Sequence, residues 1–410
     1  MQIKKYLEKY EMKNRVAQRM STLSPSLTLA ISAKAKAMKA AGESVVSFSV
    51  GEPDFNTPDH IIQAAKVALD NGQTKYTPSA GLLPLRKAIC EKFKKDNGLD
   101  YEPSQIIVSN GAKHSIFNAC YAVLDEGDEV IIPAPYWLTY PEVVKVCGAT
   151  PVYIDCKKEN KFKFTAEELK AAITPKTKML IFNSPSNPTG AVYTEEEVRA
   201  IAKVCEEAEI FVLSDEIYEK LCYNGVKPFS MAACSEKMKD LTITVNGVSK
   251  TYAMTGWRVG YLAAPKDVAK AIDSFQSHAT SNACSISQAA TLEALASSEE
   301  EIQAMVDVFD KRRAKLLALI DGIDGVSAVE PDGAFYVMLV IGGLYGKSYQ
   351  GKAITNSVEF ADVLLDAEKV ATVPGVSFGA DDCLRLSYSL SEADIEEGLA
   401  RIKRFVSQLA

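Results

Sequence analysis

The sequence is poor in the residues from which metal sites and disulfide frameworks are built. It has three histidines, at positions 60, 114 and 278, which lie far apart. Its nine cysteines are scattered without a Cys-x-x-Cys pair. Zinc sites require clustered ligands, and disulfide frameworks require paired thiols. We therefore expect no metal centre, and we interpret the cysteines as small, buried apolar residues.

Long apolar runs and an excess of positive charge are also missing. No run reaches the ~18 apolar residues that a membrane-spanning helix requires, and the mixed charges of residues 1–20 differ from a secretory signal. The net charge is -7 at pH 7, whereas nucleic-acid-binding surfaces are basic. These features predict a cytoplasmic globular protein that binds neither nucleic acid nor a membrane.

Residues 105–265 alternate between short apolar runs and amphipathic segments. The runs of strand length are QIIVS, DEVIIPAP, KMLIF, EIFVLS, LTITV and RVGYLAAP. Between two of them, TEEEVRAIAKVCEEA has helical apolar spacing, and Thr194 with Glu197 matches a capping box. Buried strands alternating with helices predict an α/β fold with a mostly parallel sheet flanked by helices.

The C-terminal part has a different pattern. EEEIQAMVDVFDKRRAKLLALIDGI predicts one long amphipathic helix, GAFYVMLVI and CLRLSYSL predict strands, and SEADIEEGLARIKRFVSQL predicts a final helix. We expect a large domain over 55–300 and a smaller α+β domain over 301–410. Residues 1–54 would form an N-terminal arm and part of the small domain.

Polar segments follow several of the predicted strands. They are Asn110–Lys113, Asn183–Gly190, Asp215–Tyr218 and Asn246–Lys250, with Arg258 a few positions beyond the last. Ligands of open α/β sheets bind at the carboxyl ends of the strands. We therefore expect these segments to converge on one crevice.

Each of these segments alone has an ordinary structural explanation. Gly111-Ala112-Lys113 matches a plain helix start, Asp215 a cap, and Lys250 a surface lysine. Together they supply a phosphate site at a helix N-terminus, an acid, a phenol, an amide and a lysine. This combination points to pyridoxal 5'-phosphate, whose aldehyde forms a Schiff base with a lysine and whose ring nitrogen pairs with a carboxylate.

Several motifs resemble those of the class I and II aminotransferases of pyridoxal-phosphate fold type I. The motifs are SKTYAMTGWRVGY, NSPSNPTG, SDEIY, GEPDF, KYTPSAG, PYW, GAFYV and RLSY. Within the family the chain is most similar to bacterial aspartate aminotransferases of the prokaryotic subgroup. The resemblance implies transfer of the amino group of L-aspartate to 2-oxoglutarate, giving oxaloacetate and L-glutamate. It also implies a homodimer with shared active sites.

The resemblance assigns catalytic roles to three residues. Lys250 would hold the cofactor and move the proton, Asp215 would keep the ring nitrogen protonated, and Tyr218 would hydrogen-bond the ring 3-oxygen. The other implied cofactor contacts are Gly111, Ala112, Lys113, Trp137, Asn187, Ser249, Arg258 and, from the neighbouring subunit, Tyr76.

The substrate would be held by Arg385, which matches the arginine that pairs with the α-carboxylate in a fork geometry that lysine cannot reproduce. On its strand Arg385 points away from its leucine neighbours, into either solvent or a site. The other implied substrate contacts are Gly51, Trp137, Asn187 and Thr28.

The side-chain specificity stays open at this stage. Some relatives read the distal carboxylate with an arginine, yet AIDSFQSHATSNACSISQAA contains none. Thr28 matches a threonine that the prokaryotic subgroup uses instead, and Tyr121 stands where some members carry lysine. The alternatives are an aromatic-amino-acid or prephenate aminotransferase, a carbon–sulfur lyase, or a cofactor-sensing regulator, which would need a basic DNA-binding extension.

Overall fold

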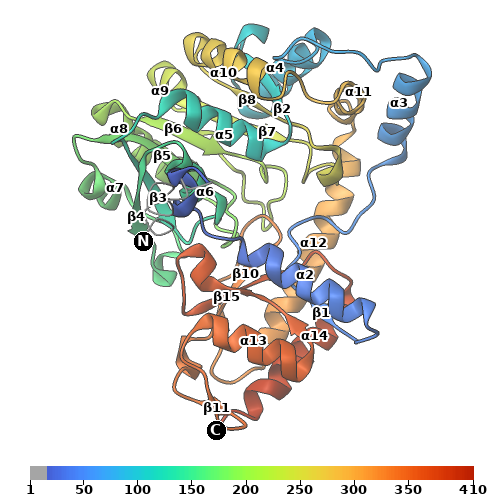
Figure 1. The fold of residues 1–410 in the computed structure, drawn as a ribbon, viewed down its shortest axis with the longest axis vertical. Helices are drawn as coiled ribbons and strands as arrows, with labels where there is room; N and C mark the ends of the chain where they lie inside the picture. The colour runs from blue at the N-terminus through green and yellow to red at the C-terminus, as the bar shows by residue number, and fades with distance from the viewer. Residues whose placement is uncertain (1–15) are drawn as a thin grey trace, which may run out of the picture.

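The computed structural model describes residues 16–410, and a seven-stranded sheet forms the centre of its larger part (Figure 1). The strands, in order across the sheet, are β2 (Ile106–Ser109), β8 (Gly260–Ala263), β7 (Thr242–Gly247), β6 (Phe211–Asp215), β5 (Thr177–Asn183), β3 (Glu129–Ala134) and β4 (Thr150–Asp155). Only β8 runs in the opposite direction to the other six strands. The predicted mostly parallel sheet is confirmed, although the sequence analysis did not identify β4.

Helices cover both faces of this sheet. One face packs against α5 (Ala112–Val123), α6 (Thr139–Val146) and α10 (Lys266–Ala279). The other packs against α4 (Leu83–Asn97), α7 (Ala166–Ala172), α8 (Glu195–Ala208), α9 (Glu236–Leu241) and α11 (Ser285–Ala294), with α3 (Asp59–Asp70) against α11. Successive strand residues alternate between the two cores: Val130 and Ile132 enter one, and Ile131 the other.

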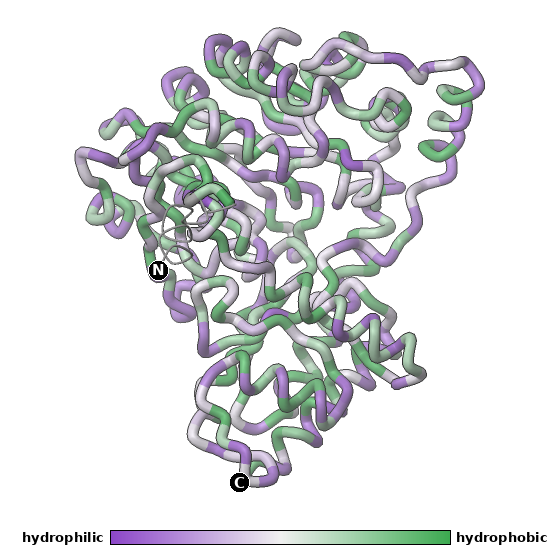
Figure 2. The backbone as a smooth tube through the Cα atoms, viewed as in Figure 1, coloured by the Kyte–Doolittle hydropathy of each residue, from purple (hydrophilic) through white to green (hydrophobic). Residues whose placement is uncertain are grey.

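The amphipathic character of the outer helices is visible in Figure 2, where the tube changes between purple and green along their length. In α8 the predicted capping box is confirmed: Thr194 Oγ1 accepts from the Glu197 N–H at 3.3 Å, and Glu197 Oε2 accepts from the Thr194 N–H at 2.8 Å. These bonds satisfy amide groups that the first helical turn leaves without partners.

The smaller part is built on a four-stranded sheet of β14 (Val373–Pro374), β15 (Cys383–Ser387), β10 (Tyr336–Val340) and β9 (Ser327–Ala328). It packs with α13 (Ser357–Glu368), α14 (Glu392–Ser407) and α12 (Glu299–Ile320), which runs between the two parts (Figure 1). The predicted long helix, two strands and final helix are thus confirmed as α12, β10, β15 and α14.

N-terminal residues join this smaller part. α2 (Leu27–Ala40) contacts it, and β1 (Val46–Ser47) pairs in parallel with β13 (Val370–Ala371). The domain limits at 54 and 300 stay predictions, and residues 1–15 of the predicted arm lie outside the described residues. The remaining strands are β11 (Ser348–Tyr349) and β12 (Lys352–Ala353). Short 3-10 helices occur at Gln18–Thr22, Pro103–Gln105, Lys158–Asn160, Met231–Ala233, Thr255–Trp257, Gly342–Leu344 and Gly375–Phe378.

The cysteines only partly follow the sequence-based expectation. Those at 90, 120, 156, 205 and 383 are buried, but those at 147, 222 and 234 are only partly buried. Cys284 is exposed, because it lies at the position just before α11 rather than in the core. Within residues 16–410 no cluster of His, Cys, Asp and Glu could hold a metal ion. In the same range no helix combines the length and apolarity needed to cross a membrane.

The contact between β8 and the start of α5 allows only glycine. A Cβ on Gly260 would lie 2.2 Å from the Ala112 nitrogen and 2.4 Å from the Gly111 carbonyl carbon. Because main-chain atoms cannot rotate away, Gly260→Ala should lower the free energy of unfolding by about 1–3 kcal/mol. Gly256→Ala is the matched control, since its Cβ would meet nothing within 4 Å. Urea melts of both variants measure the difference, and equal losses would contradict this account.

Candidate active site

The polar segments predicted from the sequence lie at one edge of the large sheet. β2, β5, β6 and β7 all end there: the antiparallel β8 separates β2 from β7, so these two strands point the same way. Side-chain contacts link neighbouring strand ends. The Asn183 amide nitrogen, at the end of β5, donates to the Asp215 carbonyl oxygen at 2.8 Å. Asn183 also accepts from the Asn187 N–H at 2.9 Å, which fixes the loop after β5.

Lys250 occupies the loop that follows β7. Its Nζ donates to the Gly51 carbonyl oxygen at 2.5 Å and lies 5.7 Å and 5.5 Å from the ring centroids of Tyr218 and Phe335. Desolvation lowers the pKa of Lys250 to about 8, although the Glu52 carboxylate acts in the opposite direction. An amine with this pKa is partly neutral near physiological pH, so it can act as a nucleophile and as a base.

Asp215 is the last residue of β6 and is buried. Its carboxylate accepts from the Tyr140 hydroxyl at 2.7 Å and from the Ile217 N–H at 3.2 Å. Burial raises the pKa of Asp215 to about 6, and these hydrogen bonds oppose the rise. A cationic ring nitrogen beside this carboxylate would stabilise its ionised form.

Cations and free amides gather where β2 meets α5. Gly111 has a φ of +87°, and a Cβ there would lie 2.3 Å from Arg258 Nη2. Arg258 donates to the carbonyl oxygens of Thr255 at 2.8 Å and Asn110 at 3.5 Å. Desolvation and the nearby Arg258 lower the pKa of Lys113, whose Nζ lies 4.9 Å from the Trp137 ring centroid. A helix N-terminus flanked by two cations suits a phosphate group.

Arg385 lies in β15, where its side chain is buried rather than solvated, with the residue 2% exposed. The guanidinium donates to Asn187 Oδ1 at 3.1 Å and to the Ser49 carbonyl oxygen at 3.0 Å. It stacks on Tyr336 at 4.5 Å and lies 5.1 Å from the Phe378 centroid. Its Nε has no hydrogen-bond partner within residues 16–410. A buried cation with spare donors is a site for a carboxylate.

Thr28 lies near the start of α2. One helical turn further on, the Ser32 hydroxyl is 3.1 Å from that of Ser49, whose carbonyl oxygen accepts from Arg385. Residues four apart share a helix face. The buried Thr28 Oγ1 has no hydrogen-bond partner in the described part of the chain. The Thr28 hydroxyl is therefore a candidate second contact for a ligand bound to Arg385.

Two residues singled out from the sequence do not join this group. Tyr76 is 90% exposed. Tyr121 is also exposed, on α5, with its ring stacked 4.2 Å from that of Phe275. Ser249, by contrast, is buried in the loop that carries Lys250.

Sequence reasoning missed two tyrosines that orient the predicted groups. Tyr140 binds Asp215, and the Tyr336 hydroxyl lies 3.0 Å from that of Tyr218. Tyr336 belongs to the GAFYV motif, which was recognised without a role for this residue. Tyr140 follows the PYW motif by three positions, but a single sequence does not distinguish it from a core tyrosine.

Comparisons with known proteins match this architecture. The family Aminotransferase class I and II matches residues 43–402. The aspartate aminotransferase of Bacillus subtilis is 49% identical over 394 residues, which cover 96% of this chain and 99% of that protein. The probable aspartate/prephenate aminotransferase of Aquifex aeolicus is 45% identical, covering 97% and 100%.

A solved structure agrees equally well. The crystal structure of the aspartate aminotransferase from Rhizobium meliloti has a TM-score of 0.94 and 43% identity, and the match covers 97% of this chain and 100% of that one. The family match and these relatives span nearly the whole sequence. The chain therefore belongs to the class I and II aminotransferases.

Proposed function

We propose that the protein is a pyridoxal-phosphate-dependent aspartate aminotransferase. It would transfer the amino group of L-aspartate to 2-oxoglutarate, yielding oxaloacetate and L-glutamate. The observation that carries this proposal is the Lys250 amine, whose pKa is lowered to about 8, in a site that also holds the buried Asp215 and Arg385. The names of the relatives favour an aminotransferase over the carbon–sulfur lyase and regulator alternatives.

The donor set fits the cofactor that the family resemblance implies. Pyridoxal 5'-phosphate supplies, when bound, an aldehyde that reacts with a lysine and a ring that accepts electrons. The α5 N-terminus with Arg258 would hold its phosphate, and Asp215 its ring nitrogen. The other residues proposed to contact it are Gly111, Ala112, Lys113, Trp137, Asn187, Tyr218, Ser249 and Lys250.

The chain's own groups then account for the two half-reactions. Arg385 and Asn187 would bind the substrate α-carboxylate and orient the α-carbon toward Lys250. Neutral Lys250 would take the proton from that carbon and deliver it to the C4' atom of the bound cofactor. This is general acid–base catalysis. In the first half-reaction the C–N bond of aspartate would break, with the nitrogen kept on the bound cofactor and water supplying the keto oxygen of oxaloacetate. In the second, the C–N bond of glutamate would form from that nitrogen, and the keto oxygen of 2-oxoglutarate would leave as water. The aromatic rings of Phe335 and Phe378 would limit access of water.

Recognition of the distal carboxylate is proposed to involve Thr28, whose Oγ1 is free of hydrogen bonds within residues 16–410. The printed name of the Aquifex aeolicus relative keeps prephenate as a second candidate substrate. Aspartate and prephenate each carry two carboxylates. Arg385 and the neutral Thr28 hydroxyl could therefore bind the two carboxylates of either compound.

We also propose a homodimer with shared active sites. Tyr76 is 90% exposed, as expected of a residue whose contacts come from another subunit. In this arrangement its hydroxyl would reach the phosphate bound by the partner subunit.

The donor can be identified from the visible absorbance of the cofactor-loaded protein. L-Aspartate should abolish the visible band, and 2-oxoglutarate should restore it, because each half-reaction changes the cofactor between its aldehyde and amine forms. L-Tyrosine and L-glutamate, added separately, compare other donors. A band that ignores aspartate but responds to another donor would overturn the aspartate assignment and leave the aminotransferase assignment in place.

Cofactor uptake by the cofactor-free protein should follow the ionisation of Lys250. With a pKa of about 8, the reactive neutral amine makes up about one tenth of the population at pH 7 and about nine tenths at pH 9. Stopped-flow uptake should therefore accelerate up to about tenfold over this range and then level off. Lys250→Ala is the control and should lose this dependence. A rate that keeps climbing toward pH 10.5, the ordinary value, would contradict the lowered pKa.

Subunit sharing can be tested through Tyr76. Tyr76→Phe removes one hydrogen bond to a charged phosphate and should weaken cofactor binding by about tenfold. Tyr153→Phe, at another exposed tyrosine, is the matched control. In mixed dimers, a Lys250→Ala subunit should restore tight binding in its Tyr76→Phe partner, as measured by equilibrium titration. Unchanged binding in the mixture would refute the shared site.

A further inference from the structure

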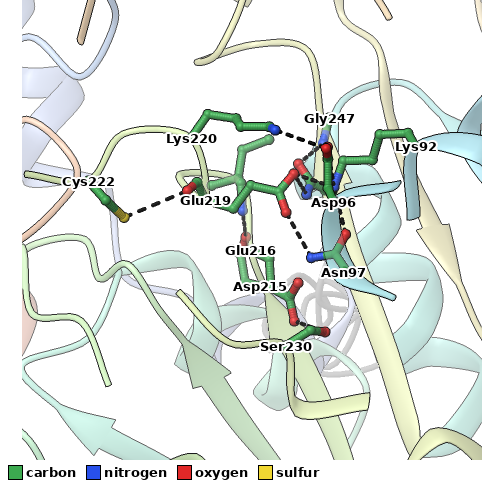
Figure 3. Close-up of polar contacts among 12 residues, drawn as sticks. Lys92, Asp96, Asn97, Asp215, Glu216, Glu219, Lys220, Cys222, Ser230 and Gly247 are labelled. Atoms are coloured by element: carbon green, nitrogen blue, oxygen red, sulfur yellow. Dashed lines mark hydrogen bonds and ion pairs between the residues drawn. The ribbon is translucent and has the colours of Figure 1, made fainter. Parts of the chain in front are cut away.

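A cluster of charged and amide side chains lies beside the site, on the side of β6 and β7 that faces α4 (Figure 3). Its centre is Glu219, which is 8% exposed. The Glu219 carboxylate forms an ion pair with Lys92 and accepts from the amides of Asn246 at 2.8 Å and Asn97 at 3.1 Å. Although burial opposes ionisation, the Lys92 ion pair, the Asn97 hydrogen bond and the Lys220 charge lower the pKa of Glu219. The carboxylate is therefore charged and held from several directions.

Charges further out balance this centre. Lys92 also lies 3.6 Å from Asp96, which is 3.0 Å from Lys220. The neighbouring Glu216 accepts from the hydroxyls of Ser214 and Ser230, each at 2.8 Å. Burial, with the nearby Glu219 charge, raises the pKa of Glu216 to about 7.

The cluster joins the two chain segments that carry the proposed reacting groups. Glu219 directly follows Tyr218 in the turn after β6, and Asn246 precedes Lys250 by four positions at the end of β7. Asn246 Oδ1 also accepts from the Gly247 N–H at 2.7 Å. Meanwhile Lys250 Nζ lies 5.7 Å from the Tyr218 ring centroid. The Glu219 carboxylate thus connects the turn after β6 with the end of β7. The functional groups of these two segments, Tyr218 and Lys250, lie close together in the site.

Stability alone gives little reason for such a centre. Lys92 lies on α4, whose neighbouring buried residues Ile89 and Phe93 belong to an apolar core. Replacing a buried ion pair by apolar residues is often neutral or stabilising. The ion pair instead fixes geometry. The Glu219 carboxylate has enough acceptor positions to hold the Asn246 and Asn97 amides as well as the Lys92 ammonium.

We propose that Glu219, held by Lys92, is a positioning residue for the transamination chemistry. Its charged carboxylate sets the spacing between the turn that carries Tyr218 and the loop that carries Lys250, without touching substrate or cofactor. This inference rests on the proposed function.

The test uses the cofactor-loaded protein and its variants Glu219→Gln, Lys92→Met and the double variant. Lys94→Met is the matched control: Lys94 lies on the same helix and pairs with Asp100 at 3.0 Å, but both side chains are exposed. The measurements are the thermal midpoint, kcat and KM for the amino donor, and the pH midpoint of the visible absorbance of the bound cofactor.

Lys92→Met removes the ion-pair partner of the buried Glu219 carboxylate, and Glu219→Gln leaves Lys92 only its 3.6 Å pair with Asp96. Both should therefore lose stability and at least about tenfold in kcat, with KM changing less than about threefold. Their absorbance midpoint should move by about 0.5 pH unit or more. The double variant removes both charges, so its thermal midpoint should return toward that of the wild type. Its kcat and absorbance midpoint should stay altered, because the positioning contact is still missing.

The double variant also guards against a single variant that does not fold. Native kcat and a native absorbance midpoint in the double variant would overturn the proposal and leave the cluster a purely structural role. If the wild type uses a donor other than aspartate, only the substrate assignment fails, and the same comparison with that donor tests Glu219. A wild-type protein that binds no cofactor would overturn both.

Discussion

Positive charge gathered without carboxylate partners is the constraint on which the site depends. Lys113, Lys250, Arg258 and Arg385 form no ion pair with an Asp or Glu among the residues described, 16–410. Desolvation therefore lowers the pKa of Lys250 and of Arg385. Uncompensated charge in a partly dry site costs free energy, so the arrangement is stable only because the surrounding core holds it. An anionic ligand would lower this cost, because its binding would also neutralise the unpaired cations of the site.

The fold meets this constraint by separating two kinds of charge. Asp215, at the reacting edge, is held by hydrogen bonds from Tyr140 and Ile217 rather than by an ion pair. Lys92 and Lys220, on the other side of the β6–β7 layer, are paired with Asp96 and Glu219. The cations at the reacting edge therefore stay without carboxylate partners among residues 16–410, while those of the supporting side are paired.

Features that depend on local pattern could be predicted from the sequence. Apolar runs identified six of the seven strands of the large sheet, and Thr194 with Glu197 identified the start of α8. Polar residues after strands led to Asp215 and Lys250, because strand ends meet at one edge in such sheets.

Features that depend on tertiary contacts could not be predicted in this way. Arg385 is buried in a site because Asn187, in the loop after β5, and Ser49 contact it, which alternation along one strand cannot reveal. Cys284 is exposed because of its position at a helix terminus rather than its residue type. The Glu219 cluster joins three segments distant in sequence, so no single motif contains it.

The antiparallel strand β8 has a consequence for how members of the family can be recognised from their sequences. Because the chain reaches the site edge at the end of β7 and leaves it in the antiparallel β8, the loop between them carries both Lys250 and Arg258. In a parallel crossover these two groups would be separated by a helix of variable length. Here the amine and the cation that we propose to bind phosphate lie within one short segment, which joins two neighbouring strands. A reaction that needs both groups is therefore marked by one short sequence motif of about a dozen residues.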